Sequence, residues 1–115
     1  MIANTNIGGY YPLTLTIGAD KVVSFRRLVD GVPHDYSGAI WDAAIIDGTG
    51  AICTQLATPI LDGGPDHYVS VHITSADTLT LLPRGTYEWY VRSAQGGVIT
   101  SELCGSVKIL GKGGS

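Results

Sequence analysis

Residues 78–110 read TLTLLPRGTYEWYVRSAQGGVITSELCGSVKIL, and this stretch decides the fold. Its segment LPRGTY, residues 82–87, is typical of a corner at which a chain crosses between the two sheets of a β-sandwich. In such a corner a tyrosine near the start of the incoming strand bonds back to upstream backbone, a position that Tyr87 would fill. Tyr87, Trp89 and Val91 recur at every second position. This alternation predicts a strand over residues 86–93 with these three side chains in the core.

A hairpin is predicted directly after this strand. Gln95-Gly96-Gly97 supplies two adjacent glycines, which tolerate the positive φ angles that a tight hairpin turn requires. The return strand is expected over Val98–Leu110. Gly105 interrupts its pattern, which indicates either a β-bulge or a break between two short strands.

The rest of the chain predicts short strands separated by turn residues. Apolar alternation and β-branched residues place these strands at 11–17, 21–29, 40–47, 51–56 and 67–74. Loops are expected at 30–38 and at 58–66, where prolines and paired glycines argue against a central strand. Trp41 is expected to fill the core between the sheets. A single helical turn is predicted near 75–80, with Ser75 as its N-cap.

Together these elements predict an all-β, immunoglobulin-like sandwich of about seven antiparallel strands. Within the 115 residues we expect an extended N-terminal arm at 1–9, the sandwich at 10–110 and a glycine-rich C-terminal tail at 111–115. This length suits one domain with a single core.

Composition argues against several classes of partner. The net charge is −3, and no lysine or arginine cluster exceeds Arg26-Arg27, so we expect no nucleic-acid partner. No apolar run approaches the roughly 20 residues that span a bilayer, so we expect no membrane partner. The first residues, MIANTNIGGYYP, lack the features of a signal peptide. We therefore expect a protein made in a reducing cytosol.

No pattern in the sequence predicts catalysis. Asp47-Gly48-Thr49-Gly50 superficially resembles the Asp-Thr-Gly of aspartic proteases, but Gly48 intervenes and a hairpin turn is the better interpretation. Glu88 and Glu102 are expected to be solvated strand residues rather than a carboxylate pair in a cleft. We find no Ser-His-Asp, nucleophile-elbow or phosphate-loop pattern, and we expect a non-enzymatic protein.

Metal and thiol chemistry are not expected either. His34, His67 and His72 are expected to be ordinary polar residues at the surface. A metal site built from the loops beside Asp35, Asp62 and Asp66 is the alternative. Residues 62–66 lack the ligand spacing of a calcium-binding loop. We expect no cofactor. Cys53 and Cys104 are expected to be small buried apolar residues, with a disulfide between them as the alternative.

Tyrosines supply the candidate interface residues, which are Tyr10, Tyr11, Tyr36 and Tyr90. Tyr90 shares a strand face with Glu88 and Arg92, and an exposed tyrosine flanked by charges suits a protein contact. An ordinary surface tyrosine is the alternative.

Residues spread along the second half of the chain match the pattern of a known family. They are Thr74, Thr78, Leu82, Gly85, Tyr87, Trp89, Val91, Gly96, Gly97, Thr100 and Gly105. On these residues the chain resembles small immunoglobulin-like β-sandwich domains of tailed-bacteriophage virion proteins. It is most similar to the N-terminal domain of phage baseplate upper proteins, with related domains in tail-fibre and neck components. The resemblance covers roughly residues 10–110.

The resemblance implies a structural protein of the virion that assembles in multiple copies in the host cytoplasm. It implies contacts with other virion proteins and with copies of itself, most directly as a tail, baseplate or neck adaptor. Family members are often longer and carry receptor-binding modules after the sandwich. Because this sequence stops at Ser115, we expect a stand-alone adaptor. The alternatives are a capsid decoration protein, or a carbohydrate or cell-surface binding module using Trp89, Tyr90 and the loops at 30–38 and 58–66.

Overall fold

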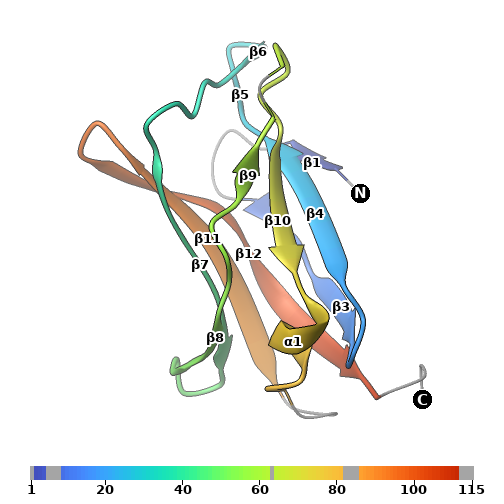
Figure 1. The fold of residues 1–115 in the computed structure, drawn as a ribbon. Helices are drawn as coiled ribbons and strands as arrows, with labels where there is room; N and C mark the ends of the chain where they lie inside the picture. The colour runs from blue at the N-terminus through green and yellow to red at the C-terminus, as the bar shows by residue number, and fades with distance from the viewer. Residues whose placement is uncertain (1, 5–8, 63, 82–85, 112–115) are drawn as a thin grey trace.

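The computed structural model describes residues 2–4, 9–62, 64–81 and 86–111, which form two β-sheets packed face to face (Figure 1). This arrangement confirms the predicted all-β sandwich. The four-stranded sheet has the order β1-β4-β10-β9, with bounds Ile2–Asn4, Lys21–Arg26, Val69–Ile73 and Ile60–Leu61. The six-stranded sheet has the order β2-β12-β11-β7-β8, and β3 also pairs with β12. Its bounds are Gly9–Tyr10, Val98–Leu110, Tyr87–Gln95, Ile40–Asp47 and Ile52–Gln55, with β3 at Leu13–Thr16.

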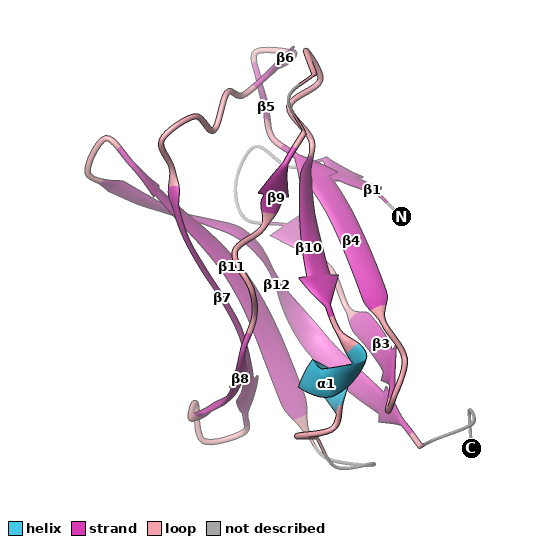
Figure 2. Cartoon of the chain, viewed as in Figure 1, coloured by secondary structure: helices cyan, strands magenta, loops and turns pink. Residues whose placement is uncertain are grey.

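The remaining elements are small. β5 (Leu28–Val29) and β6 (Val32–Pro33) form a hairpin at one end of the sandwich. Asp30 and Gly31 both have positive φ in its turn, as a two-residue hairpin turn of the favoured twist requires. α1 (Ser75–Thr78) is the one helix of the described residues and lies near the other end (Figure 2). β9, within the segment predicted to be irregular, pairs only at the edge of its sheet.

The N-terminal strands pair in parallel, which the prediction of antiparallel strands missed. β1 lies parallel to β4, and both β2 and β3 lie parallel to β12. Of the predicted strand at 11–17, Leu13–Thr16 forms β3, whereas β2 lies before that range at Gly9–Tyr10. Alternation of side chains specifies which face a residue occupies but not which strand lies beside it. Within the predicted arm, residues 2–4 belong to the sheet as β1.

One local detail, the N-cap of the helix, also differs from the prediction. The N-cap of α1 is Thr74, because its hydroxyl accepts from the Asp77 N–H while the Asp77 carboxylate accepts from the Thr74 N–H. Ser75 is already the first helical residue, and its N–H donates to Asp20 Oδ1 at 2.6 Å. The turn after β7 is confirmed: Thr49 N and Oγ1 both donate to Asp47 Oδ1.

Both tryptophans were expected in the core, and Trp89 alone is fully buried there. Tyr87, Trp89 and Val91 are buried as predicted, and Trp89 is only 1% exposed. Trp89 Nε1 donates to the carbonyl of Tyr11 at 2.8 Å, which satisfies the indole donor within the core. Trp41 is only partly buried, because it lies next to the start of β7, where the sandwich opens towards its end.

The last strand contains a β-bulge and also a glycine that lies close to the backbone of Tyr11. β12 runs unbroken through Gly105, so the predicted bulge or break at that residue is wrong. The bulge lies at Glu102: Val91 pairs with Leu103 and Arg92 with Ser101, which leaves Glu102 as the extra residue. Gly105 is needed for a different reason, because a Cβ there would lie 2.4 Å from the carbonyl oxygen of Tyr11.

The hairpin before β12 is confirmed, with φ of 59° at Gly96 and 82° at Gly97. The predicted corner falls mainly on residues 82–85, and the predicted tail on 112–115, so both lie outside the described residues. The Tyr87 side chain is described, and it is buried.

Both cysteines are free. Cys53 is on β8 and Cys104 on β12, with β7 and β11 between them in the same sheet. Three strand spacings amount to about 14 Å, well beyond the reach of a disulfide. The disulfide alternative is therefore wrong, and so is the expected burial of Cys104, which is exposed.

Candidate protein-protein interface

The outer face of the six-stranded sheet is the surface with the most distinctive chemistry. Because neighbouring residues of a strand point to opposite sides, burial of Tyr87, Trp89 and Val91 directs the intervening side chains of β11 outwards. Strand pairing then aligns residues into rows across the sheet. From one end to the other, the rows are Ile99–Ala94–Ile40, Ser101–Arg92–Asp42, Tyr10–Cys104–Tyr90–Ala44–Gln55, Ser106–Glu88–Ile46–Ile52 and Thr14–Lys108. We call these residues the outer face.

One end of the outer face is apolar. Ile40 and Ile99 are each 73% exposed, and Val98, at the hairpin next to them, is 63% exposed. A depression of about 130 Å³ lies between the two isoleucines and also borders Trp41 and Ala94. Exposed aliphatic side chains that gather around a hollow mark a site where apolar surface of a partner can be buried.

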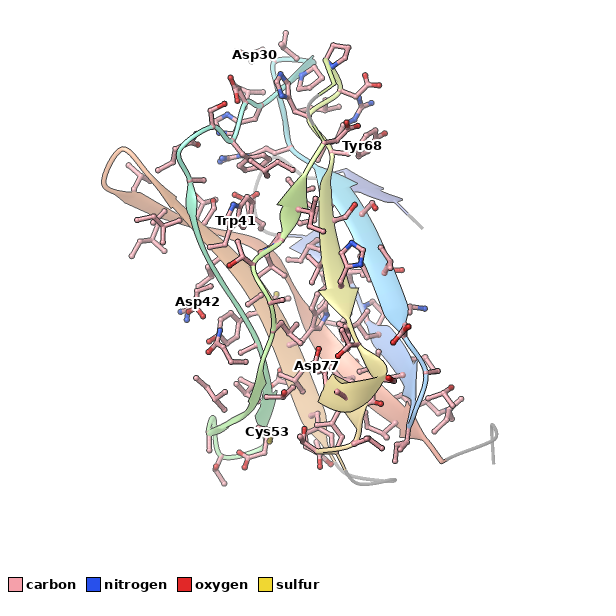
Figure 3. The ribbon with its side chains drawn as sticks, viewed as in Figure 1. Asp30, Trp41, Asp42, Cys53, Tyr68 and Asp77 are labelled. Carbon is pink, nitrogen blue, oxygen red and sulfur yellow. The ribbon has the colours of Figure 1, made fainter. Side chains whose placement is uncertain are left out.

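The centre of the outer face is a fixed polar network. Arg92 Nη2 contacts Asp42 Oδ2 at 2.6 Å, and the guanidinium lies 4.2 Å from the centre of the Tyr90 ring. Gln55 Nε2 donates to Asp42 Oδ1 at 3.0 Å. The hydrogen bond from Gln55, and then that from Arg92, lower the pKa of Asp42, so this carboxylate stays charged. Figure 3 shows Asp42 directed away from the sandwich.

The opposite outer face, on the four-stranded sheet, is more polar at its centre. There Ser24 and Ser70 lie side by side on β4 and β10 and share a hydrogen bond of 2.9 Å. The next pair along is Val22 with His72. Exposed aliphatic residues also lie on this face, namely Val22 and Ile60, which pairs with Ser70.

Two of the four predicted interface tyrosines lie together, and two do not. Tyr10, which is 70% exposed, and Tyr90 occupy the same row of the outer face. Tyr11 packs against the core, with its ring centre 6.3 Å from that of Trp89. Tyr36 is 2% exposed, so its proposed place in an interface is wrong: its ring fills the core between Phe25 and Trp41.

Sequence reasoning missed the isoleucines and the Asp42–Arg92 pair. The available signal was weak, because Ile40 and Ile99 follow the alternation of ordinary strands. Only the pairing of β7, β11 and β12 brings them into one row.

A charged residue lies inside the sandwich, where none was expected. Glu102 is 1% exposed, and its carboxylate accepts from Tyr36 Oη at 2.8 Å and from Ser93 Oγ at 2.7 Å. Arg27 Nη2 lies 3.5 Å from the same carboxylate. The prediction of a solvated Glu102 is wrong because the bulge turns this side chain inwards. Glu88 lies on the outer face, so the two carboxylates do not meet.

The buried Glu102 carboxylate makes the stability of the fold depend on pH under alkaline conditions, through Tyr36. Burial, and then the charge of Glu102, raise the pKa of Tyr36 above its ordinary value of 10.0. Above about pH 10 the unfolded chain loses this proton while the folded chain keeps it. We therefore expect the free energy of unfolding to fall by up to about 1.4 kcal/mol per pH unit in that range, and to be unaffected by this group below it.

Urea unfolding at a series of pH values measures this slope, and Tyr36→Phe is the control. The variant should show a shallower loss of stability above about pH 10, since it has no proton to release there. Equal slopes in the two proteins would contradict the assignment to Tyr36.

The histidines and loop carboxylates form no recognisable ligand set. In the described part of the chain, no group of three His, Cys, Asp or Glu residues is arranged to hold a metal ion. His34 Nε2 hydrogen-bonds Gln95 Oε1 at 2.7 Å. A second depression, of about 190 Å³, lies between the two predicted loops and borders Asp35, Asp62, His67 and Tyr68. Trp89, named above for carbohydrate binding, is in the core.

Comparisons with known proteins bear on the fold. No protein-family model matches this chain, and no curated protein matches it in sequence. Among solved structures, the chain is similar to the N-terminal domain of ORF48 from phage TP901-1, with a TM-score of 0.52 and 10% sequence identity. The similarity covers 94% of this chain and 93% of that domain. At this identity it shows a fold shared with a phage protein domain. Within the described residues, no helix is long and apolar enough to cross a membrane.

Proposed function

We propose that this chain is a non-enzymatic structural protein of a tailed-bacteriophage virion, which assembles in several copies as a tail, baseplate or neck adaptor. The observation that carries this proposal is the outer face, where exposed isoleucines adjoin a fixed Asp42–Arg92 pair. The fold that presents this face is shared along nearly its whole length with a phage protein domain, which supports the phage setting.

The outer face suits protein contact in two physical respects. Its apolar end offers aliphatic surface whose removal from water stabilises a complex by about 25 cal/mol per Å². Its polar centre is already ordered, because Asp42 is held by both Arg92 and Gln55. A partner therefore meets side chains that lose little further conformational entropy on binding.

The absence of an enzymatic role is part of the proposal. Two carboxylates of the six-stranded sheet are occupied by structural contacts: Asp42 binds Arg92 and Gln55, and Glu102 binds Tyr36 and Ser93. We infer partners that are other virion proteins and copies of this chain, with no nucleic acid, membrane or cofactor. Assembly would take place in the host cytoplasm.

Electron microscopy tests the location directly. An antibody against this chain, followed by gold-labelled secondary antibody, is applied to virions of the phage that encodes it. We expect gold at the tail, baseplate or neck. Gold over the head would instead assign a capsid decoration protein, and unlabelled virions that carry every other structural protein would refute the proposal.

Ile99→Asp tests the role of the outer face. In phage that depend on the variant gene, we expect binding about 30-fold weaker and correspondingly less gold per virion, since one interface anchor is commonly worth about 2 kcal/mol. The matched control is Val22→Asp, which places the same charge on an exposed strand residue of the opposite outer face. Equal incorporation of the two variants would contradict a role for this face.

A further inference from the structure

Two opposite charges of the outer face flank Tyr90 at equal distances along β11. Glu88 and Arg92 lie on the same strand, two residues before and two residues after Tyr90, and all three point outwards. Each is therefore about 7 Å along the strand from the tyrosine. Arg92 remains 46% exposed while it contacts Asp42. Glu88 is exposed and has no ion-pair partner among the described residues.

This spacing makes the face complementary to itself. Consider a second copy placed on the outer face by a two-fold axis. The axis lies between the six-stranded sheets of the two copies, runs perpendicular to β11 and passes over Tyr90. The axis places β11 over β11 with its direction reversed. Glu88 of each copy then lies over Arg92 of the other, and the two Tyr90 rings meet at the axis. An isologous contact of this kind repeats each favourable pair twice.

The overall charge of the face also favours a second copy. Its ionised side chains are Asp42, Glu88, Arg92 and Lys108, two of each sign, so their charges sum to zero, whereas the chain carries −3. Two copies that meet at this face avoid the repulsion that other orientations bring. Lys108 belongs to the face because it is exposed between buried Val107 and Ile109.

The size of the face is adequate. The six strands contain 40 residues, and each residue covers about 3.4 by 4.8 Å of the sheet. The resulting area of about 650 Å² approaches the ~800 Å² per partner of a standard protein interface.

We propose that the outer face binds a second copy of this chain about a two-fold axis at Tyr90, held by reciprocal Glu88–Arg92 ion pairs. This inference rests on the proposed function, since it names the partner of the same face. The two six-stranded sheets would pack about 10 Å apart with strands within about 30° of alignment, the geometry of sheets packed face to face. The apolar hollow at Ile40 and Ile99 would lie at the periphery of this contact.

Sedimentation equilibrium of the purified chain, up to ~100 µM, tests the proposal. We expect a monomer–dimer equilibrium. Glu88→Arg makes both flanking positions positive, and Arg92→Glu makes both negative, so each variant alone should weaken its dimer at least about tenfold. Mixed in equal amounts, the two variants should form a heterodimer, because arginines of one copy then face glutamates of the other.

The mixture separates a specific contact from general loss of structure. Arg92→Glu also removes the partner of Asp42, so circular dichroism must first show that each variant is folded. Lys21→Glu, a charge reversal on β4 of the other sheet, is the control and should leave the dimer unchanged. A wild-type chain that is monomeric throughout, or folded variants that fail to associate when mixed, would overturn the proposal. If the purified chain is a monomer but the antibody still detects it on virions, this inference alone would be overturned and the proposed function would stand.

Discussion

Replacing Glu102 by leucine is expected to lower the free energy of unfolding by about 3–5 kcal/mol. The substitution leaves the Arg27 cation, which is largely buried, without its carboxylate. It also removes the acceptor of Tyr36 Oη and of Ser93 Oγ, both in the core. Buried donors without acceptors cost about 1–3 kcal/mol each, because they lose water without gaining a replacement. Urea unfolding monitored by tryptophan fluorescence measures the change.

The second partner of the ion pair provides the control. Arg27→Met combined with Glu102→Leu removes both charges and should recover part of the loss, since an apolar pair of similar volume often replaces a buried ion pair without cost. Recovery is expected to be incomplete, because Tyr36 and Ser93 still lack an acceptor. If Glu102→Leu alone were neutral, the carboxylate would not be held as the structure describes.

Gly105→Ala is expected to lower the free energy of unfolding by about 3 kcal/mol. The new methyl group would meet backbone atoms of Tyr11 and Pro12, and backbone cannot rotate away as a side chain can. β12 and this segment would have to separate. The movement would strain the bond from Tyr11 N to Cys104 O, and the bond from Trp89 Nε1 to Tyr11 O. Thermal unfolding should show a midpoint lower by about 10 °C.

Gly48→Ala is the matched control for this substitution. Gly48 has no heavy atom within 4 Å of a built Cβ, and its φ is not positive. The same chemical change there should therefore not lower the midpoint and should raise it by up to about 4 °C. Equal effects at the two positions would mean that the close approach at Gly105 does not matter.

The sequence predicts the central strands well because their faces differ in polarity. Alternation at Tyr87, Trp89 and Val91 correctly assigned the core face of β11, and paired glycines correctly assigned the hairpin after it. Glu102 could not be assigned in this way. A bulge shifts the alternation by one residue, and no residue type in β12 indicates where the shift occurs.

The candidate interface could be predicted only in part for a related reason. Tyr10 and Tyr90 were named from residue type, and they share a row only because β2 pairs in parallel with β12. Tyr36 was also named from residue type, but its burial depends on the acceptor that Glu102 supplies inside the sandwich. Which surface residues become neighbours depends on register, and register is a property of strand pairs rather than of single strands.

The parallel strands at the N-terminus have a consequence for the order of folding. Leu13 pairs with Val107 and Tyr10 with Cys104, so β2 and β3 have no partner until the last strand has been synthesised. Contacts so distant along the chain make folding slow, because a long loop must close before any of them forms. Until β12 is available, the backbone groups of β2 and β3 that bond to it would remain unpaired. Closure of the six-stranded sheet therefore has to await β12, and a chain truncated before β12 could not present the complete outer face.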